Sequence, residues 1–247
     1  MVQSRIDSAQ HSLFGDNDDM KIPDPKLPEC EPWSKLEQLK NEKETTGIYI
    51  SGHPLDDYKI EMEHFCNYTL ADLKEIEQLK NKEVSVAGIV TNFAEKTSKT
   101  GNLYGVFTLE DYNDSIQQSL FSKNYMTFKN YLVKGYFLFI KGKVELRYQS
   151  ENQYEFRISN IMQLSDVLDT NVKTITIKVA IIDITDNFIE KIFKVIKSSK
   201  GICSLKVLFI DPVNNLSVEM ASKKFYVNPN RFLKEIIQFP EIKFRIN

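Results

Sequence analysis

The sequence has 247 residues, which exceeds one average domain and fits two small domains joined by a connecting segment. Hydrophobic residues make up 42% and charged residues 27%, as in an ordinary soluble globular protein, and no apolar run is long enough to span a membrane. The cysteines Cys30, Cys66 and Cys203 lie far apart, which excludes a readable disulfide framework and predicts a cytoplasmic location.

The net charge of −2 conceals a gradient along the chain. Residues 1–81 hold 9 Lys and Arg against 17 Asp and Glu, residues 82–166 hold 10 against 9, and residues 167–247 hold 13 against 8. This asymmetry indicates that the later segments face anionic or acidic partners. The pI near 6.0, however, gives none of the general basic character of a nucleic-acid-binding protein.

Residues 1–32 are predicted to be a short binding peptide followed by an acidic, proline-rich linker. In Gln10-His11-Ser12-Leu13-Phe14 two bulky apolar side chains stand together where no local core exists to bury them. Leu13 and Phe14 could enter an apolar pocket on a partner, while the Gln10 amide fixes the register. Packing of Leu13 and Phe14 on the body of this protein is the alternative.

Residues 33–81 are predicted to be a helical connecting segment. Apolar residues at helical spacing predict a helix from Trp33 to Thr46 that Gly47 can end, and further helices are expected over residues 56–65 and 69–79. His53 stands between Gly52 and Pro54, which favours a fixed turn. A zinc site combining it with the neighbouring histidine and cysteines is disfavoured, because no pair has the usual ligand spacing.

Residues 82–166 alternate as β-strands do, starting at Glu83. A polar loop is predicted over residues 94–102, and further strands over 103–110, 115–121, 135–147 and 154–164, with a short helix over 123–132. Five strands with one helix between the third and fourth is the order of an OB-fold barrel. Gly88 and Gly142 lie inside strands, where a small barrel needs sharp bends.

OB folds hold oligonucleotides with the loops after strands one and four and with the face of strands two and three. On the second strand, Leu103, Gly105, Phe107 and Leu109 are expected to face the core. Cations could neutralise phosphates and tyrosines could stack on bases, which makes the candidate residues Lys96, Lys99, Asn102, Tyr104, Arg147 and Tyr148, with Lys141 and Lys143 as additional cations. The alternative is that these lysines are merely solvated and the tyrosines pack.

The carboxylates Glu110, Asp111 and Asp114 form a cluster that could suggest a metal site. They stand at the expected hairpin turn, where Asp and Asn are favoured because their side chains bond to the nearby backbone. No metal site is therefore predicted there.

Residues 172–247 are predicted to form a small α+β domain. Strands are expected over residues 174–182, 203–210, 216–221, 224–227 and 242–246, with a helix over 186–197 capped by Asp186 and closed near Gly201, and another starting at Pro229. The first helix is basic through Lys191, Lys194 and Lys197. The fold class is thus α+β, mainly β.

The succession of a QxSLFG peptide, an acidic linker, a WSKLE helix and the block EKETTGIYISGHPLDDY (residues 42–58) resembles the alpha subunit of bacterial DNA polymerase III, after its catalytic domains. The resemblance implies sliding-clamp binding by Gln10, Ser12, Leu13 and Phe14, template single-strand contact by the OB barrel, and clamp-loader contact by the C-terminal domain. The loop Lys99-Thr100-Gly101-Asn102 also resembles a TKKG-like loop of that family.

The carboxylates that would bind two magnesium ions in the polymerase have no counterpart here, so this segment is expected to bind no cofactor and to catalyse nothing alone. Magnesium and nucleotidyl transfer would belong to the full polymerase. The chain would contact the rest of that polymerase, and no contact with a membrane is expected. The alternatives are a stand-alone OB-fold protein that binds single-stranded DNA or tRNA, and a structural adaptor whose barrel binds only protein.

Overall fold

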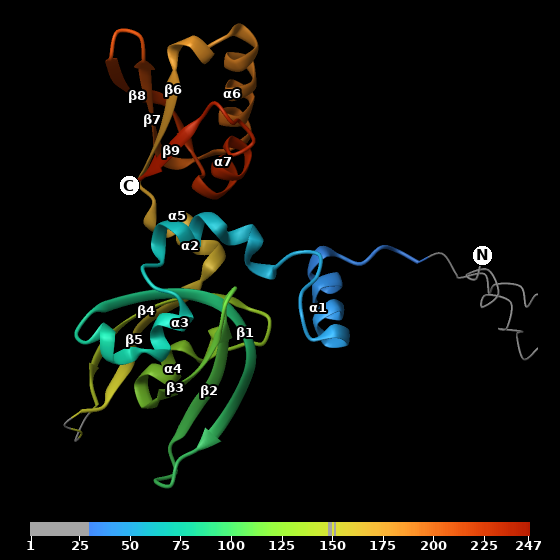
Figure 1. The fold of residues 1–247 in the computed structure, drawn as a ribbon, viewed down its shortest axis with the longest axis vertical. Helices are drawn as coiled ribbons and strands as arrows, with labels where there is room; N and C mark the ends of the chain where they lie inside the picture. Colours follow the sequence, from blue (N-terminus) through green and yellow to red (C-terminus); the bar gives the residue numbers. More distant parts are fainter. Residues whose placement is uncertain (1–29, 148–149, 151) are drawn as a thin grey trace, which may run out of the picture.

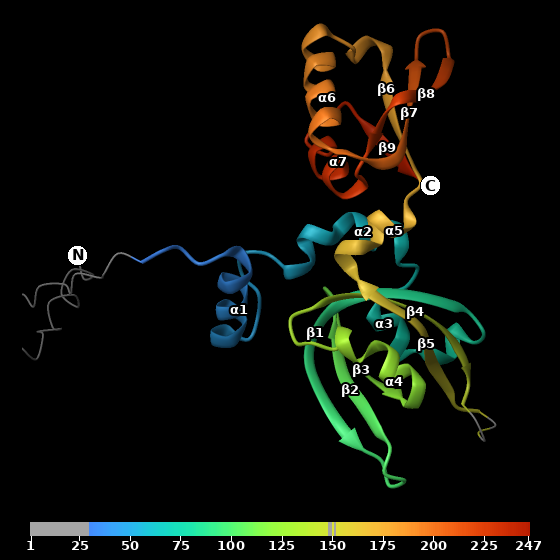
Figure 2. The ribbon, with the colours of Figure 1, turned by 180° about the vertical axis from the view of Figure 1, so that it is seen from behind.

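The computed structural model describes residues 30–147, 150 and 152–247. A connecting segment leads into a domain built on a five-stranded sheet, and a C-terminal domain with a four-stranded sheet follows. Figures 1 and 2 show the two domains at opposite ends of the molecule, with helices α2 (Lys59–Phe65) and α5 (Val167–Asn171) between them. Within the described residues, no helix is long and apolar enough to cross a membrane.

The connecting segment is helical, as predicted. Helix α1 (Lys35–Thr46) begins with a capping box between Ser34 and Glu37 and ends at Gly47, whose φ of 85° suits a residue without a Cβ. The helix predicted over residues 56–65 divides into η2 (Pro54–Tyr58) and α2. Helix α3 (Leu70–Lys74), capped by Thr69, and η3 (Ile76–Leu79) complete the segment.

The first sheet is antiparallel and has the order β3-β2-β1-β4-β5. Its long strand β1 (Glu83–Thr97) pairs with β4 through its first half and with β2 through its second half. The other strands are β2 (Leu103–Glu110), β3 (Ser115–Phe121), β4 (Phe137–Leu146) and β5 (Tyr154–Gln163). Helix α4 (Ser122–Phe128) and η4 (Lys129–Tyr131) follow β3, and α4 contacts β2, β3 and β5. The predicted OB-fold order is confirmed.

Two strand glycines are required by close approach of neighbouring strands. A Cβ at Gly88 would lie 2.5 Å from the carbonyl oxygen of Glu110, and one at Gly142 would lie 2.4 Å from that of Arg157. A side chain at either position would push two paired strands apart.

Two sequence predictions for this domain were wrong. Strand β1 continues to Thr97, so residues 94–97 belong to a strand and the loop is shorter than expected. Leu103 is 47% exposed rather than buried, because it lies next to the turn of the β1–β2 hairpin, where it pairs with Thr97. After this domain, α5 (Val167–Asn171) buries Val167 and Leu168 between the domains.

The C-terminal sheet has the order β8-β7-β6-β9. Strand β6 (Thr174–Ala180) is parallel to β7 (Lys200–Asp211), while β8 (Leu216–Val227) and β9 (Lys243–Ile246) are antiparallel edge strands. η6 (Ile181–Asp183) follows β6. Helices α6 (Asp186–Ser198) and α7 (Pro229–Ile236) contact each other and lie on the same side of the sheet (Figures 1 and 2).

Local details of this domain also differ from the prediction. Thr185, not Asp186, caps α6, because its side chain accepts a hydrogen bond from the Phe188 N–H. Gly201 lies inside β7 and does not close the helix, which ends at Ser198. The two strands expected over residues 216–227 are one strand with a register shift opposite Ser204 and Lys206. Pro229 does begin α7.

Candidate nucleic-acid interface

Three side chains from three adjacent strands form a row across the outer face of the first sheet. Lys96 of β1 lies directly opposite Tyr104 of β2, and Tyr104 lies directly opposite Phe121 of β3. Directly opposed residues of antiparallel strands point to the same side of a sheet. We call Lys96, Tyr104 and Phe121 the outer row. It places a cation beside two aromatic rings.

The two aromatic rings of the outer row form one surface. Their centroids lie 5.0 Å apart with an interplanar angle of 22°, and Phe121 is 57% exposed. An exposed, nearly parallel aromatic pair is the kind of platform on which nucleobases stack.

Sequence analysis selected Lys96 and Tyr104 but missed Phe121. The signal was present in β3, where Ile116 and Leu120 are buried while Gln117 and Ser119 face outward. Phe121 is the next outward-facing position of β3 after these polar residues, so its large ring points away from the core.

The rest of the outer face is small or polar. The next two positions along each strand bring together Ala94, Val106 and Ser119, and then Asn92, Thr108 and Gln117. On the opposite face the Tyr125 ring covers Gly105, where a Cβ would lie 2.7 Å from it. The Tyr125 hydroxyl donates to Glu95, which raises the pKa of the tyrosine to about 12. The strands under the outer row are therefore held from the core side.

The loop between β1 and β2 presents Lys99 to solvent, and neither Lys99 nor Lys96 forms an ion pair within the described part of the chain. Asn102 shapes this turn: its N–H donates to Ser98 Oγ at 3.1 Å and its side-chain amide donates to Thr100 Oγ1 at 3.3 Å. Lys99 thus extends the outer face with a free cation, while the contacts seen for Asn102 are internal to the loop.

The other predicted loop connects β4 to β5, and its residues 148, 149 and 151 lie outside the described residues. Arg147 is exposed there, and its N–H donates to the Gln153 carbonyl at 2.7 Å. Tyr148 lies outside the described residues, as do the peptide residues Gln10, Ser12, Leu13 and Phe14.

Lys141 and Lys143 do not join the outer row. They pair with Ser85 and Glu83 near the beginning of β1, whereas Lys96 lies near its end. They line a separate open hollow of about 660 Å³ with Arg157, and Lys143 is in contact with Glu145 at 3.3 Å.

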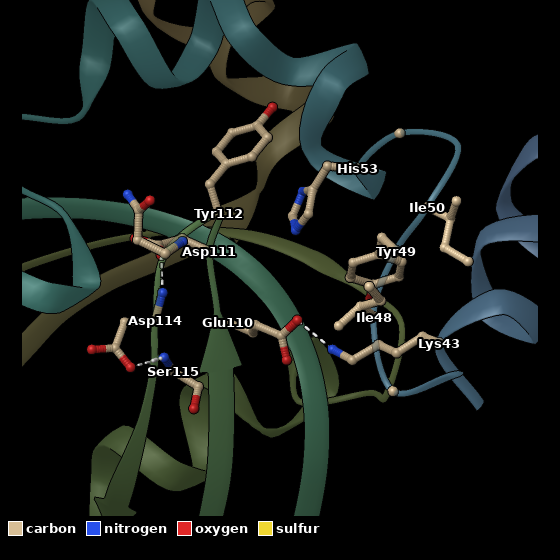
Figure 3. A pocket seen from close by; sticks show the side chains of 13 residues that line it. Lys43, Ile48, Tyr49, Ile50, His53, Glu110, Asp111, Tyr112, Asp114 and Ser115 are labelled. Carbon is tan, nitrogen blue, oxygen red and sulfur yellow. Dashed lines mark hydrogen bonds and ion pairs between the residues drawn. The ribbon is translucent and has the colours of Figure 1, made fainter. Parts of the chain in front are cut away.

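A second hollow, of about 610 Å³, lies where the connecting segment meets the turn between β2 and β3 (Figure 3). The His53 ring stands between Tyr49 and Tyr112, with centroid distances of 5.0 and 4.4 Å. Its Nδ1 accepts from the Leu55 N–H at 3.2 Å, and burial lowers the pKa of His53. The prediction that His53 belongs to a fixed turn is confirmed.

The carboxylates at this turn all have structural partners. Asp111 is buried and accepts hydrogen bonds from the N–H groups of Leu70, Asn113 and Asp114 at 2.8 to 2.9 Å. Glu110 pairs with Lys43 of α1, and Asp114 pairs with Lys74 of α3 at 2.6 Å. No group of ligands suited to a metal ion occurs among the described residues. The turn therefore fastens the connecting segment to the sheet.

This fold and the outer row define an OB-fold domain of the nucleic-acid-binding class. Residues 84–164 match the family model described as OB-fold nucleic acid binding domain, and residues 175–247 match the model described as DNA polymerase III alpha subunit, C-terminal domain. These matches confirm the resemblance read from the sequence: the chain is similar to the C-terminal region of DNA polymerase III alpha subunits.

Curated relatives agree with this assignment. The alpha subunit of Haemophilus influenzae is 25% identical over 83% of this chain, that of Pseudomonas fluorescens is 24% identical over 71%, and that of Escherichia coli K12 is 31% identical over 47%. The matched parts make up 18%, 15% and 10% of those proteins, so the chain spans less than a fifth of their length. A mitochondrial single-stranded DNA-binding protein of Saccharomyces cerevisiae, Rim1, aligns over 34% of this chain and 96% of its own, at 18% identity and a TM-score of 0.27.

Proposed function

We propose that this chain is the non-catalytic, DNA-contacting and tethering arm of a replicative DNA polymerase. The observation that carries the proposal is the outer row, which combines a lysine that forms no ion pair among the described residues with a stacked aromatic pair, half-buried Tyr104 and exposed Phe121, on a domain of the OB-fold class. The family match at the C-terminal domain supports the polymerase context over a stand-alone OB protein, because relatives align across both domains.

In this proposal the OB domain contacts single-stranded template DNA. Tyr104 and Phe121 receive bases, while Lys96 and Lys99 neutralise neighbouring phosphates. The domain carries 10 Lys and Arg against 9 Asp and Glu over residues 82–166, so its binding is weak and salt-sensitive. Such a surface guides a strand that the rest of a polymerase already holds.

Titration of a fluorescent oligo-dT with the full chain at low salt tests the DNA contact. Tyr104→Ala and Phe121→Ala are each expected to weaken binding by about 1–3 kcal/mol, because each removes a stacking surface. Lys99→Glu is expected to weaken it as well.

Two matched controls use exposed residues away from the β1–β3 face: Met126→Ala in α4 and Lys129→Glu in η4. Equal affinity of the row variants and these controls would remove the basis of the proposal.

We infer that the segment Gln10–Phe14 binds the sliding clamp. Its support is the QxSLF pattern, with two adjacent apolar side chains ahead of an acidic stretch, in a chain that is similar to this family. Purified clamp should be retained by the wild-type chain and lost by Leu13→Ala/Phe14→Ala. Equal retention by both chains would overturn the clamp assignment without touching the DNA assignment.

The C-terminal domain is the proposed contact for the clamp loader. Its excess of basic residues and the exposed lysines Lys191 and Lys194 of α6 fit an acidic protein surface. Reversal of both charges should weaken co-purification with the clamp loader at low salt, and unchanged co-purification would contradict this contact. Nucleotidyl transfer and its magnesium ions would belong to a complete polymerase, so the purified chain is expected to incorporate no nucleotide.

A further inference from the structure

The C-terminal sheet has one face covered by helices and one face open. Ile175, Ile177 and Val179 of β6 are buried in a core that also contains residues of α6 and α7. Because side chains alternate along a strand, the residues between them point to the other side. In Figures 1 and 2 both helices lie on one side of this sheet, and no helix of the described residues covers the other side.

Cations gather on the open face. Thr176 of β6 lies between Arg245 of β9 and Lys206 of β7, and in the next row Lys178 lies between Lys243 of β9 and Leu208 of β7. Lys178, Lys243 and Arg245 are exposed and form no ion pair within the residues that the structure describes.

A single carboxylate on this face, Glu219 of β8, is opposite Leu208. Its Oε1 contacts Lys206 Nζ at 2.6 Å, and its pKa is lowered first by Lys206 and further by Arg245. One acid thus faces four cations, and the face retains a net positive charge.

The same face offers polar and aromatic groups beside its cations. Tyr226 of β8 lies opposite Ser204, which in turn lies opposite Thr174, and Tyr226 is 48% exposed. Thr176, in the floor between Arg245 and Lys206, is 3% exposed, and its hydroxyl has no hydrogen-bond partner in the described part of the chain. An open four-stranded sheet with cations and an exposed ring has the composition with which such sheets bind single-stranded nucleic acid.

We propose that the open face of the C-terminal sheet is a second binding surface for a single nucleic-acid strand. Phosphates lie on Lys178, Lys243 and Arg245, and a base stacks on Tyr226. The charge complementarity favours a polyanion, and the exposed ring favours one with bases over an acidic protein. The surface goes beyond the proposed function, which assigns this domain a protein partner only.

The test uses the full chain carrying Lys96→Glu/Tyr104→Ala/Phe121→Ala, which removes the outer row. Binding of a fluorescent oligo-dT 20-mer is measured at low salt. Residual binding is expected, and Lys178→Glu/Lys243→Glu should lower it about 10-fold or more, since the salt-dependent phosphate contacts supply most of it. Tyr226→Ala should lower it about 5-fold or more. Lys197→Glu/Arg231→Glu, in α6 and α7, changes charge equally on the helix-covered side and should leave binding unchanged.

Lys178→Gln/Lys243→Gln, with circular dichroism of each variant, separates loss of charge from loss of fold. Absence of residual binding, or equal effects of the helix variant Lys197→Glu/Arg231→Glu and the sheet variants, would overturn the second surface. Loss with the lysine variants but not with Tyr226→Ala would overturn the stacking of a base on Tyr226. The proposed function fails separately, if removal of the outer row leaves the affinity of the otherwise wild-type chain unchanged.

Discussion

Glu61 of α2 is buried between the two domains with a side chain that has no hydrogen-bond partner among the described residues. Burial raises the pKa of this carboxyl, and Lys234 of α7 is the nearby cation. A carboxyl with a raised folded pKa favours folding at low pH and loses that contribution as pH rises through the folded pKa. Ionised Glu61 therefore destabilises the packing of the two domains against each other.

Glu61→Gln keeps the shape and removes the ionisation. We expect it to stabilise the chain by about 1 kcal/mol near pH 8 and to have little effect at about pH 3, where the carboxyl is protonated in both the folded and the unfolded state. Chemical denaturation at the two pH values measures this. Equal effects at both would show that ionisation of Glu61 does not matter.

His53 has the opposite dependence on pH. Burial lowers its pKa, so the unfolded chain takes up a proton at a higher pH than the folded chain does. The contribution of neutral His53 to the free energy of unfolding is fully present above the pKa of the unfolded chain, about 6.5. It is lost as the pH falls from that value to the pKa of the folded chain. His53→Asn, which keeps an acceptor for the Leu55 N–H, should have a shallower loss of unfolding free energy between about pH 7.5 and 5.5. Parallel losses in both proteins would refute the assignment.

Single candidate residues could be predicted from the sequence where a side chain suited to binding DNA stands at a position that the order of the strands assigns to the binding face. Lys96 and Tyr104 follow from the usual position of oligonucleotides on an OB fold. Phe121 did not follow, because it ends a strand whose neighbours are polar, and only the register with Tyr104 reveals the pair. Whether these residues bind DNA remains a prediction.

At the scale of elements, the close approach of strands decides which residues are tolerated. Gly88→Ala places a Cβ 2.5 Å from the Glu110 carbonyl oxygen and 2.8 Å from Leu109 Cγ, so paired backbones must shift. We expect a loss of about 1–3 kcal/mol of unfolding free energy in urea denaturation. Ser119→Ala on the exposed face of β3 is the control and should change stability by less than about 0.5 kcal/mol. A neutral Gly88→Ala would show that the strands can separate freely there.

The turn between β2 and β3 is the element that fixes the connecting segment. In the wild-type chain, the two carboxylate oxygens of Asp111 accept hydrogen bonds from three N–H groups. Asp111→Asn leaves only one acceptor oxygen, so the free energy of unfolding should fall by about 1–3 kcal/mol. Thermal unfolding measures it, with exposed Asn113→Ser as the control in the same turn. No loss would mean that the loop, and not Asp111, holds Leu70.

Elements with strict alternation were predicted well: β2 and β3 have the predicted bounds, since one face of each enters the core. The end of β1 was missed, because residues 94–97 form a hairpin arm with polar or small side chains on both faces. Thr185 and Asp186 are both capable caps, and only the hydrogen bond of Thr185 distinguishes them.

At the scale of the whole molecule, the junction between the domains was not foreseen. Helix α2 contributes Phe65 to the core of the C-terminal domain and also packs against a small cluster that includes Ala87 of β1 and Val167 of α5. The sequence gives no periodicity that could link three such distant segments. The charge gradient, in contrast, was visible in the sequence. In the structure, part of the excess of basic residues in the C-terminal domain lies on the open face of its sheet.

The central claim is that the outer row binds single-stranded DNA, with Lys96 on phosphate and the two rings on bases. The salt dependence of oligo-dT binding tests it most directly. Lys96→Gln should reduce the slope of log K against log salt by about 0.7, the value for one lost phosphate contact. Tyr104→Ala and Phe121→Ala should weaken binding at every salt concentration and leave the slope unchanged. An unchanged slope for Lys96→Gln together with unchanged affinity for both ring variants would contradict the claim.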